Sequence, residues 1–387
     1  MEKSNESPHA VADLVPAERD ASIIVTARAG VLVDESRAAD PSHVGARTAT
    51  LSGESPNLDL LRATAVLCVF YGHLAGLIGL YTPRNLGFFG VVLFFVHTSY
   101  VLMGSLKRLE TGGFRRRWPL AAAFAVRRLF RIYPLSIVCV LLVPLFRVPK
   151  FPGEAYVWLG WPAYFSNLAI TQNLTHSRVV LAPLWTLPVE VQMYGFLPFL
   201  YLGLRKGRYR SFLFWIISAV ASLAIPLIFQ GRLNVLLYGP CFVAGIVAYD
   251  LSQVLRPRIP AWLWPVTLAL TVGVWKMFDG NGDFLAEVHR AWIFALVLGV
   301  LVVQFREITF APVARAVHLV AKYSYGIYVS HVAVFWFAVS RMGHFPVGLR
   351  LLAGAVLSVL VPVALYRLVE HPCIRLGSRY AQRFRRT

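Results

Sequence analysis

Residues 58–80 read LDLLRATAVLCVFYGHLAGLIGL, and this stretch decides the fold class. From Leu60 to Leu80, only Arg62 and His73 carry a charge or gain one near neutral pH. A helix needs about 20 mostly apolar residues to cross a hydrocarbon core of about 30 Å. Because backbone polar groups cannot stay unpaired in lipid, such a run must be helical there. The stretch is therefore a candidate transmembrane helix.

The composition of the whole chain agrees with a place in a lipid bilayer. Hydrophobic residues make up 57% of the 387 positions, charged residues only 15%, and the mean hydropathy is +0.60. A net charge of +19 would suggest nucleic acid in a soluble protein, but the Lys and Arg residues collect in short loops between apolar runs. We therefore expect no nucleic-acid partner. The four cysteines stand singly, so no metal site is predicted.

Apolar length gives eleven candidate segments, and charge decides how many of them cross. The segments are 58–80, 87–106, 132–147, 154–173, 183–204, 211–229, 233–251, 261–278, 289–305, 323–341 and 349–369. If 154–173 does not cross, one side receives 22 Lys and Arg residues and the other receives 8. Because basic residues stay in the cytoplasm, we predict an all-α membrane helix bundle with about ten transmembrane helices and both termini cytoplasmic. Segment 154–173, which contains Gly160, Pro162 and several aromatic residues, is expected to be re-entrant or interfacial.

The two ends of the chain differ from its middle. Residues 1–57 are rich in Ser, Ala, Asp and Glu without a lasting apolar period, which predicts a disordered cytoplasmic tail. This tail lacks the pattern of a secretory signal peptide. Residues 58–376 form the predicted transmembrane domain, and residues 377–387 form a basic cytoplasmic tail.

Arg62 and His73 are costly residues for a membrane helix, and each needs a partner or a purpose. They are eleven residues apart, which at 100° per residue brings them within roughly 20° of one face and about 16 Å apart along the axis. An imidazole can take a proton from a hydroxyl that attacks a carbonyl, so His73 is a candidate base. The alternative is a histidine that only binds a neighbouring helix.

Two further stretches carry charge at helix entries. Residues 127–134 read RRLFRIYP, where Arg128 and Arg131 share a helix face and suit phosphate; the alternative is a plain cytoplasmic anchor. Residues 184–194 read LWTLPVEVQMY, and Glu190 reaches a depth similar to that of His73. A carboxylate beside a histidine can fix its tautomer, so Glu190 is a candidate partner; otherwise it pairs with a structural arginine.

The last two helices contain further polar groups. Residues 323–331 read YSYGIYVSH and place Ser324, Tyr328 and His331 on one face. Glu370, in the sequence EHP at 370–372, could pair with the Arg128 and Arg131 cluster. Helix packing is the alternative for most of these groups, and His97 near the centre of segment 87–106 is interpreted as structural.

Taken in order, these stretches resemble the acyltransferase-3 family of integral membrane O-acyltransferases. The resemblance covers residues 58–376 and rests on Arg62 with His73, GVVLFFV at 90–96, Arg128 and Arg131 with IYP, WTLPVE at 185–190, SYGIY at 324–328 with His331, and Glu370 with Pro372. The chain departs from the family at His97 to Tyr100, where a Leu-Ser-Gly-Phe type of sequence is usual.

The resemblance implies an O-acyltransferase of the inner membrane that uses acyl-CoA as a co-substrate and holds no permanent cofactor. The acyl-CoA that we expect is acetyl-CoA. It implies His73 as the essential residue, here with Glu190 as its expected partner. The expected contacts to acyl-CoA are Arg62, Arg128, Arg131 and Tyr133, and those to substrate are Trp185, Tyr325, Tyr328, His331 and Glu370.

The implied acceptor is a sugar hydroxyl of a surface glycan or glycolipid. A macrolide or another small metabolite is the alternative acceptor. A transporter or exporter, in which the same His, Arg and Glu would relay protons, is the alternative of another class. Two similar halves, which many transporters contain, are not found in this sequence.

Overall fold

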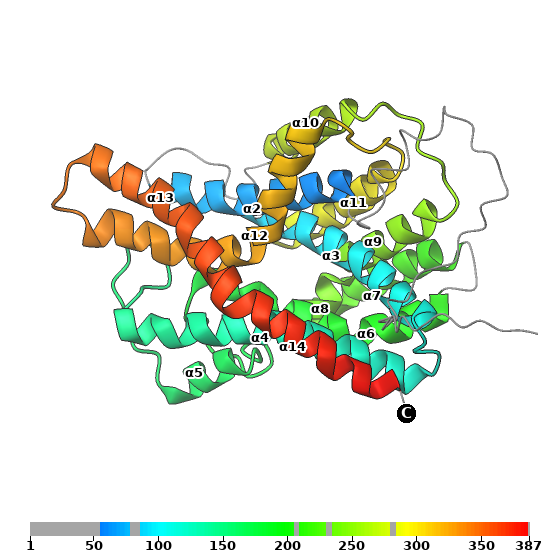
Figure 1. Cartoon of the computed structure of the whole chain (residues 1–387), viewed down its shortest axis with the longest axis horizontal. Helices are drawn as coiled ribbons and strands as arrows, with labels where there is room; N and C mark the ends of the chain where they lie inside the picture. Colours follow the sequence, from blue (N-terminus) through cyan, green and yellow to red (C-terminus); the bar gives the residue numbers. More distant parts are fainter. Residues whose placement is uncertain (1–54, 78–85, 205–208, 230–233, 279–283, 386–387) are drawn as a thin grey trace, which may run out of the picture. The chain divides into compact units, whose positions relative to one another are not determined.

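The computed structural model describes residues 55–77, 86–204, 209–229, 234–278 and 284–385, and the secondary structure of these residues is helical (Figure 1). In place of strands, they contain one isolated β-bridge between Ile259 and Phe305. The expected tail 1–57 lies outside the described residues up to position 54. The expectation of an all-α protein is therefore confirmed for the described part of the chain.

Each predicted apolar segment overlaps at least one helix of the structure. In chain order they are α2 Pro56–Leu77, α3 Leu86–Thr111, α4 Arg117–Phe146, α5 Trp161–Leu168, α6 Leu187–Leu204, α7 Arg210–Phe229, α8 Asn234–Leu237, α9 Gly239–Ser252, α10 Leu263–Met277, α11 Phe284–Val302, α12 Ala311–Trp336, α13 Val347–Leu365 and α14 His371–Ala381. Single turns of other helix types complete the set: η2 Ala182–Thr186, η3 Phe337–Arg341, η4 Tyr366–Glu370 and η5 Gln382–Arg385.

Five described helices are long and apolar enough to cross a membrane, so the chain is a membrane protein. They are Pro56–Leu77, Leu86–Thr111, Arg117–Phe146, Phe284–Val302 and the continuous helix Val347–Arg385. Shorter apolar helices such as α9 and α10 have 14 and 15 residues, fewer than the roughly 20 that a straight crossing needs. Ten crossings are therefore not established. Segment 154–173 contains only the eight-residue α5, as expected of a piece that does not span.

Two helices begin more than ten residues before their predicted start. Helix α4 was expected from 132 but starts at Arg117, so Arg128 and Arg131 lie inside it rather than before it. The residues between Pro119 and Pro134 are all compatible with a helix, and Pro119 is tolerated in its first turn. Helix α12, expected from 323, starts at Ala311 with a proline in its first turn. Apolar length underestimates helices that continue into polar surroundings.

The C-terminal helix also continues past its predicted end. Helix α13 passes through the π-helical turn η4 into α14, which ends at Ala381. A proline inside a helix removes a hydrogen bond and crowds the preceding turn, and η4 ends two residues before Pro372. Helix α14 then packs along α4 (Figure 1). Residues 377–381 of the expected basic tail are thus part of a packed helix.

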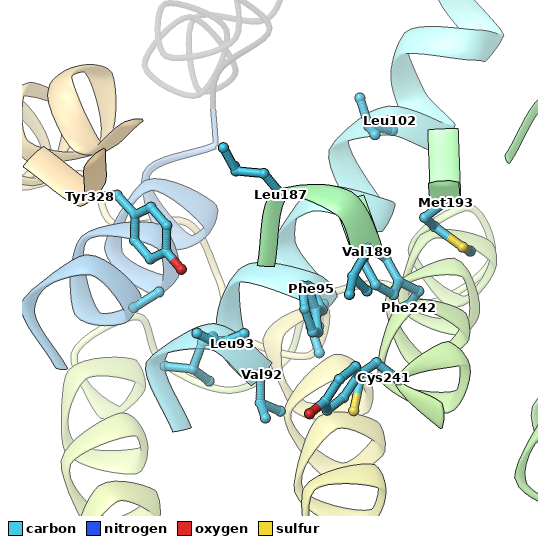
Figure 2. Packing of buried hydrophobic residues seen from close by; sticks show 14 of the residues in the cluster. Val92, Leu93, Phe95, Leu102, Leu187, Val189, Met193, Cys241, Phe242 and Tyr328 are labelled. Carbon is cyan, nitrogen blue, oxygen red and sulfur yellow. The ribbon is translucent and has the colours of Figure 1, made fainter. Parts of the chain in front are cut away.

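Close helix contacts run through the centre of the bundle. Helix α3 packs against α2 on one side and α9 on the other, and α9 packs against α11. Figure 2 shows the apolar side chains between α3, α6 and α9, where the rings of Phe95 and Phe242 stack with centroids 4.3 Å apart. Small residues let the backbones approach: a Cβ at Gly90 would lie 2.5 Å from the Ala65 carbonyl oxygen.

A glycine-to-alanine change at the contact of α3 and α9 is expected to destabilise the protein. A Cβ at Gly245 would lie 2.1 Å from the Ser99 hydroxyl oxygen and 2.2 Å from the Val96 carbonyl oxygen. Overpacking of this kind lowers the free energy of unfolding by about 1–3 kcal/mol, and we expect a loss near the upper value for Gly245→Ala. Thermal unfolding of the detergent-solubilised protein measures this loss. Gly273→Ala in α10 is the matched control, because nothing lies within 4 Å of its Cβ position. Equal unfolding temperatures for the two variants would contradict this account of the packing.

The start of α2 is fixed by polar contacts. The Ser55 hydroxyl donates to Glu307 Oε1 at 2.7 Å, and the Asn57 backbone N–H donates to Glu307 Oε2 at 3.1 Å. The Trp264 indole N–H of α10 donates to the Asn57 carbonyl at 3.1 Å. Burial raises the pKa of Glu307, and the two hydrogen bonds oppose that shift. These contacts hold the helix that bears Arg62 and His73.

Candidate active site

Polar side chains of α2 and α12 are in direct contact. The His73 and His331 rings lie with centroids 4.9 Å apart, and His73 Nδ1 is 3.3 Å from His331 Nε2. Further along, the Arg62 Nε–H donates to the Ser324 hydroxyl at 2.6 Å. Arg62 and His73 therefore face the same neighbouring helix, as their spacing predicted, and that helix presents Ser324, Tyr328 and His331 toward them.

The backbone contacts of the two histidines define their tautomers. His331 Nδ1 is 2.8 Å from the carbonyl oxygen of Tyr328, and His73 Nδ1 is 2.9 Å from that of Val69. Because a carbonyl oxygen only accepts hydrogen bonds, the hydrogen of each neutral ring is on Nδ1. His331 Nε2 is then an acceptor for the Nδ1–H of His73. This arrangement leaves a lone pair on His73 Nε2, the atom that a general base needs.

His73 lines a cavity of about 470 Å³, which we call the His73 cavity. Its described wall is mainly apolar and aromatic, with Phe88, Phe151, Trp185 and Tyr328 beside the histidine. The Phe151 ring lies nearly parallel to His73, with centroids 6.4 Å apart and an angle of 25°. A concave apolar site with a few polar groups is typical of a small-molecule site.

A second, smaller cavity of about 60 Å³ adjoins the first, and we call it the Glu190 cavity. Its described wall contains Arg62, Arg131, Glu190, Tyr194 and Ser324. The Tyr194 hydroxyl donates to the Glu190 carboxylate one helical turn away. Charged groups of both signs thus gather in this cavity, whereas the His73 cavity is mainly apolar.

The two cavities share a thin wall formed by Val91 and Tyr328. The Tyr328 hydroxyl donates to the Pro183 carbonyl at 3.0 Å and lies 2.8 Å from the Thr186 hydroxyl. Its ring meets Phe94 edge to face at 5.7 Å. These contacts connect α12 to η2 and α3 and fix Tyr328 between the two cavities.

A buried ion pair joins α4 to the C-terminal helix. Arg131 Nη2 lies 3.4 Å from Glu370 Oε1, and the Glu370 side chain is fully buried. The expected pairing of Glu370 with the arginine cluster is confirmed. Arg128, on the same face of α4, lies close enough to Glu190 and Tyr194 to interact with them electrostatically. The arginines of α4 therefore sit beside the charged cavity.

One predicted pairing is wrong. Glu190 was expected beside His73, but its side chain lines the other cavity and binds Tyr194, while the ring in contact with His73 is that of His331. Similar depth in the membrane does not place two side chains together, because each helix also has a rotation and a neighbour that the sequence does not specify. Glu190 and Arg62 do line one cavity, and this placement is closer to the alternative prediction that Glu190 pairs with an arginine.

The other expected substrate and donor residues divide between several places. Trp185 lines the His73 cavity, and Tyr325 lines the Glu190 cavity and donates to the Ile132 carbonyl at 2.8 Å. Tyr133 instead donates to the Ala169 carbonyl at 3.0 Å and lies in neither described wall. His97 is buried in α3, and its structural interpretation stays a prediction.

Several residues of the His73 cavity were not expected from the sequence. Lys150 and Phe151 come from the connection after α4, and Phe88 comes from the first turn of α3. Phe88 stands two residues before the GVVLFFV stretch, which was a usable signal. Lys150 and Phe151 belong to a loop without a helical period, so the pattern of the sequence does not bring them to His73.

The comparisons with known proteins give one match. A family model of the acyltransferase-3 type, described as an acyltransferase domain, matches residues 55–367. No match was found among curated proteins or among solved structures. The matched range includes Arg62, His73, the arginines of α4 and His331, and it ends before Glu370.

Proposed function

The chain belongs to the acyltransferase-3 family. From this premise we propose that it transfers an acyl group from cytoplasmic acyl-CoA to a sugar hydroxyl of a surface glycan or glycolipid. Acetyl is the acyl group that we propose. The observation that carries the proposal is the contact between His73 and His331 at the wall of a cavity large enough for a sugar. The aromatic wall suits the apolar face of a sugar ring, and the hydroxyl to be acylated lies against His73.

His73 acts as the base in this reaction. Its Nε2 takes the proton of the acceptor hydroxyl while the hydroxyl oxygen attacks the thioester carbonyl. A carbon–oxygen bond forms, the carbon–sulfur bond breaks, and the proton passes from His73 to the departing CoA thiolate. The Val69 carbonyl and His331 Nε2 share the Nδ1–H of His73 and so keep Nε2 free in the neutral state.

The arginines beside the Glu190 cavity hold the phosphates of the donor. Among the described residues, Arg62, Arg128 and Arg131 lie near two carboxylates, Glu190 and Glu370, so these five groups together carry an excess positive charge. Guanidinium groups suit phosphate because they donate in pairs. The cavity itself is too small for a nucleotide, so the phosphates lie outside it and only the narrow thioester arm passes toward Tyr328 and His73.

The experiment that tests this function uses the full chain in proteoliposomes. Labelled acetyl-CoA is supplied on one side and a glycan extract on the other, and label in the glycan is measured by mass spectrometry. Acyl transfer supports the proposal. Counter-flow uptake without any transfer would establish the transporter alternative instead, and transfer only to a macrolide would move the proposal to small-molecule acceptors.

Loss of the His331 ring is expected to lower kcat about tenfold, because a neutral hydrogen bond that orients a base is worth about that much. The KM for acetyl-CoA should stay the same in His331→Ala, since His331 contacts His73 and is not among the described residues that line the Glu190 cavity with Arg62 and Arg131. His331→Gln, which keeps an acceptor, should recover part of kcat. A rise in KM with unchanged kcat would instead assign His331 to substrate binding.

A further inference from the structure

Lys150 is the one residue with a permanent charge among the described residues that line the His73 cavity. The other polar side-chain groups of that wall are His73, the Tyr328 hydroxyl and the indole N–H of Trp185, and the remaining side chains are apolar. A charged group in such a wall is one of the few features that can select a ligand.

The backbone around Lys150 is fixed in place. Arg147 caps the end of α4 in the left-handed conformation with φ 54°, and Val148 is buried and donates to the Val143 carbonyl at 3.0 Å. The Lys150 carbonyl accepts the backbone N–H of Ala182 at 3.1 Å, which joins this connection to η2. The loop therefore holds the lysine at the cavity while its side chain stays exposed.

The ammonium group and the histidine meet the same aromatic ring. Lys150 Nζ lies 5.2 Å from the centroid of Phe151, and the His73 centroid lies 6.4 Å from it. None of the ion pairs formed by the described residues includes Lys150. The charge is thus close to the reacting site, is mobile on a flexible stem, and finds no carboxylate in the described part of the chain.

We propose that Lys150 makes the His73 cavity selective for acceptors that carry a negative group, a carboxylate or a phosphate, near the hydroxyl that is acylated. This inference rests on the proposed function, because it assigns the acceptor to the His73 cavity. The aromatic residues hold the sugar ring, and Lys150 pairs with the anionic substituent. Neutral sugars lose only the ion pair and still fit.

The test measures equilibrium binding by the full-length protein in lipid nanodiscs at low salt. The probes are methyl glucoside, methyl glucuronide and glucose 6-phosphate, which compare a neutral sugar with a carboxylate and with a phosphate. An exposed ion pair corresponds to about fivefold in affinity, so we expect at least one anionic probe to bind about fivefold more tightly than the glucoside. Salt should weaken that preference.

Lys150→Gln should remove the preference and leave binding of the glucoside unchanged. The matched control is Arg341→Gln, because Arg341 is also exposed and lies over an aromatic ring, with its guanidinium carbon 5.3 Å from the Trp336 centroid, but is not among the described residues of the cavity wall. Equal binding of all three probes, or a preference that survives in Lys150→Gln, overturns the inference. The binding test contains no acyl-CoA, so its result does not depend on acyl transfer. An absence of acyl transfer in the proteoliposome assay therefore contradicts the proposed function and not this inference.

Discussion

Replacement of His73 by alanine is expected to lower the rate of acyl transfer about 1,000-fold, which is within the usual contribution of a general base. Both Nδ1 atoms donate to backbone carbonyls and His331 Nε2 accepts from His73, so His73 Nε2 has the lone pair that the two rings leave free. The variant should still insert into the membrane, because its neighbours in α2 are apolar and helix-compatible. Transfer from labelled acetyl-CoA by purified protein gives the rate.

The control for this experiment is His344→Ala, which removes an exposed histidine outside the site. It should retain full activity. Near-normal transfer by His73→Ala, with normal amounts of protein in the membrane, would refute the assignment of the base. A simultaneous loss of activity in His344→Ala would point to damage that is not specific to the site.

Arg131→Leu is expected to lower the free energy of unfolding by about 3 kcal/mol, because it leaves the buried Glu370 carboxylate without its partner. No hydrogen bond of the described residues satisfies either Glu370 oxygen, so the ion pair is what compensates for its burial. Thermal unfolding in detergent without acyl-CoA measures stability apart from donor binding.

The double variant Arg131→Leu with Glu370→Leu should recover most of the lost stability, since replacing both members of a buried pair by apolar residues is often neutral or favourable. This comparison separates the cost of an unpaired charge from the loss of packing by Arg131. If the double variant is as unstable as the single one, the ion pair is not the cause.

The parts of the site that the sequence predicted depend on local spacing. Arg62 and His73 lie eleven residues apart, so helical geometry alone puts them on one face, and the same holds for Ser324, Tyr328 and His331. The apolar lengths also located most helices. In both cases, the relevant interaction is within one helix or between one helix and lipid.

The parts that could not be predicted depend on how separate elements meet. Glu190 was expected at the depth of His73 but lines a different cavity, because the rotation of α6 is set by its contacts with α3 and α4. Lys150 lies at the His73 cavity because its carbonyl accepts a hydrogen bond from Ala182 of η2, which joins the loop after α4 to an element about 30 residues later in the chain. Such pairings follow from tertiary packing, which a single sequence does not encode as a pattern.

The wall between the two cavities has a consequence for the direction of the chemistry. Among the described residues, Val91 and Tyr328 are the two that line both cavities, so their side chains lie between the charged Glu190 cavity and the mainly aromatic His73 cavity. If each substrate enters its own cavity, they meet across these side chains, and neither needs to cross the membrane. The protein then works as a partition through which a small chemical group passes while both molecules that exchange it stay in their own compartments.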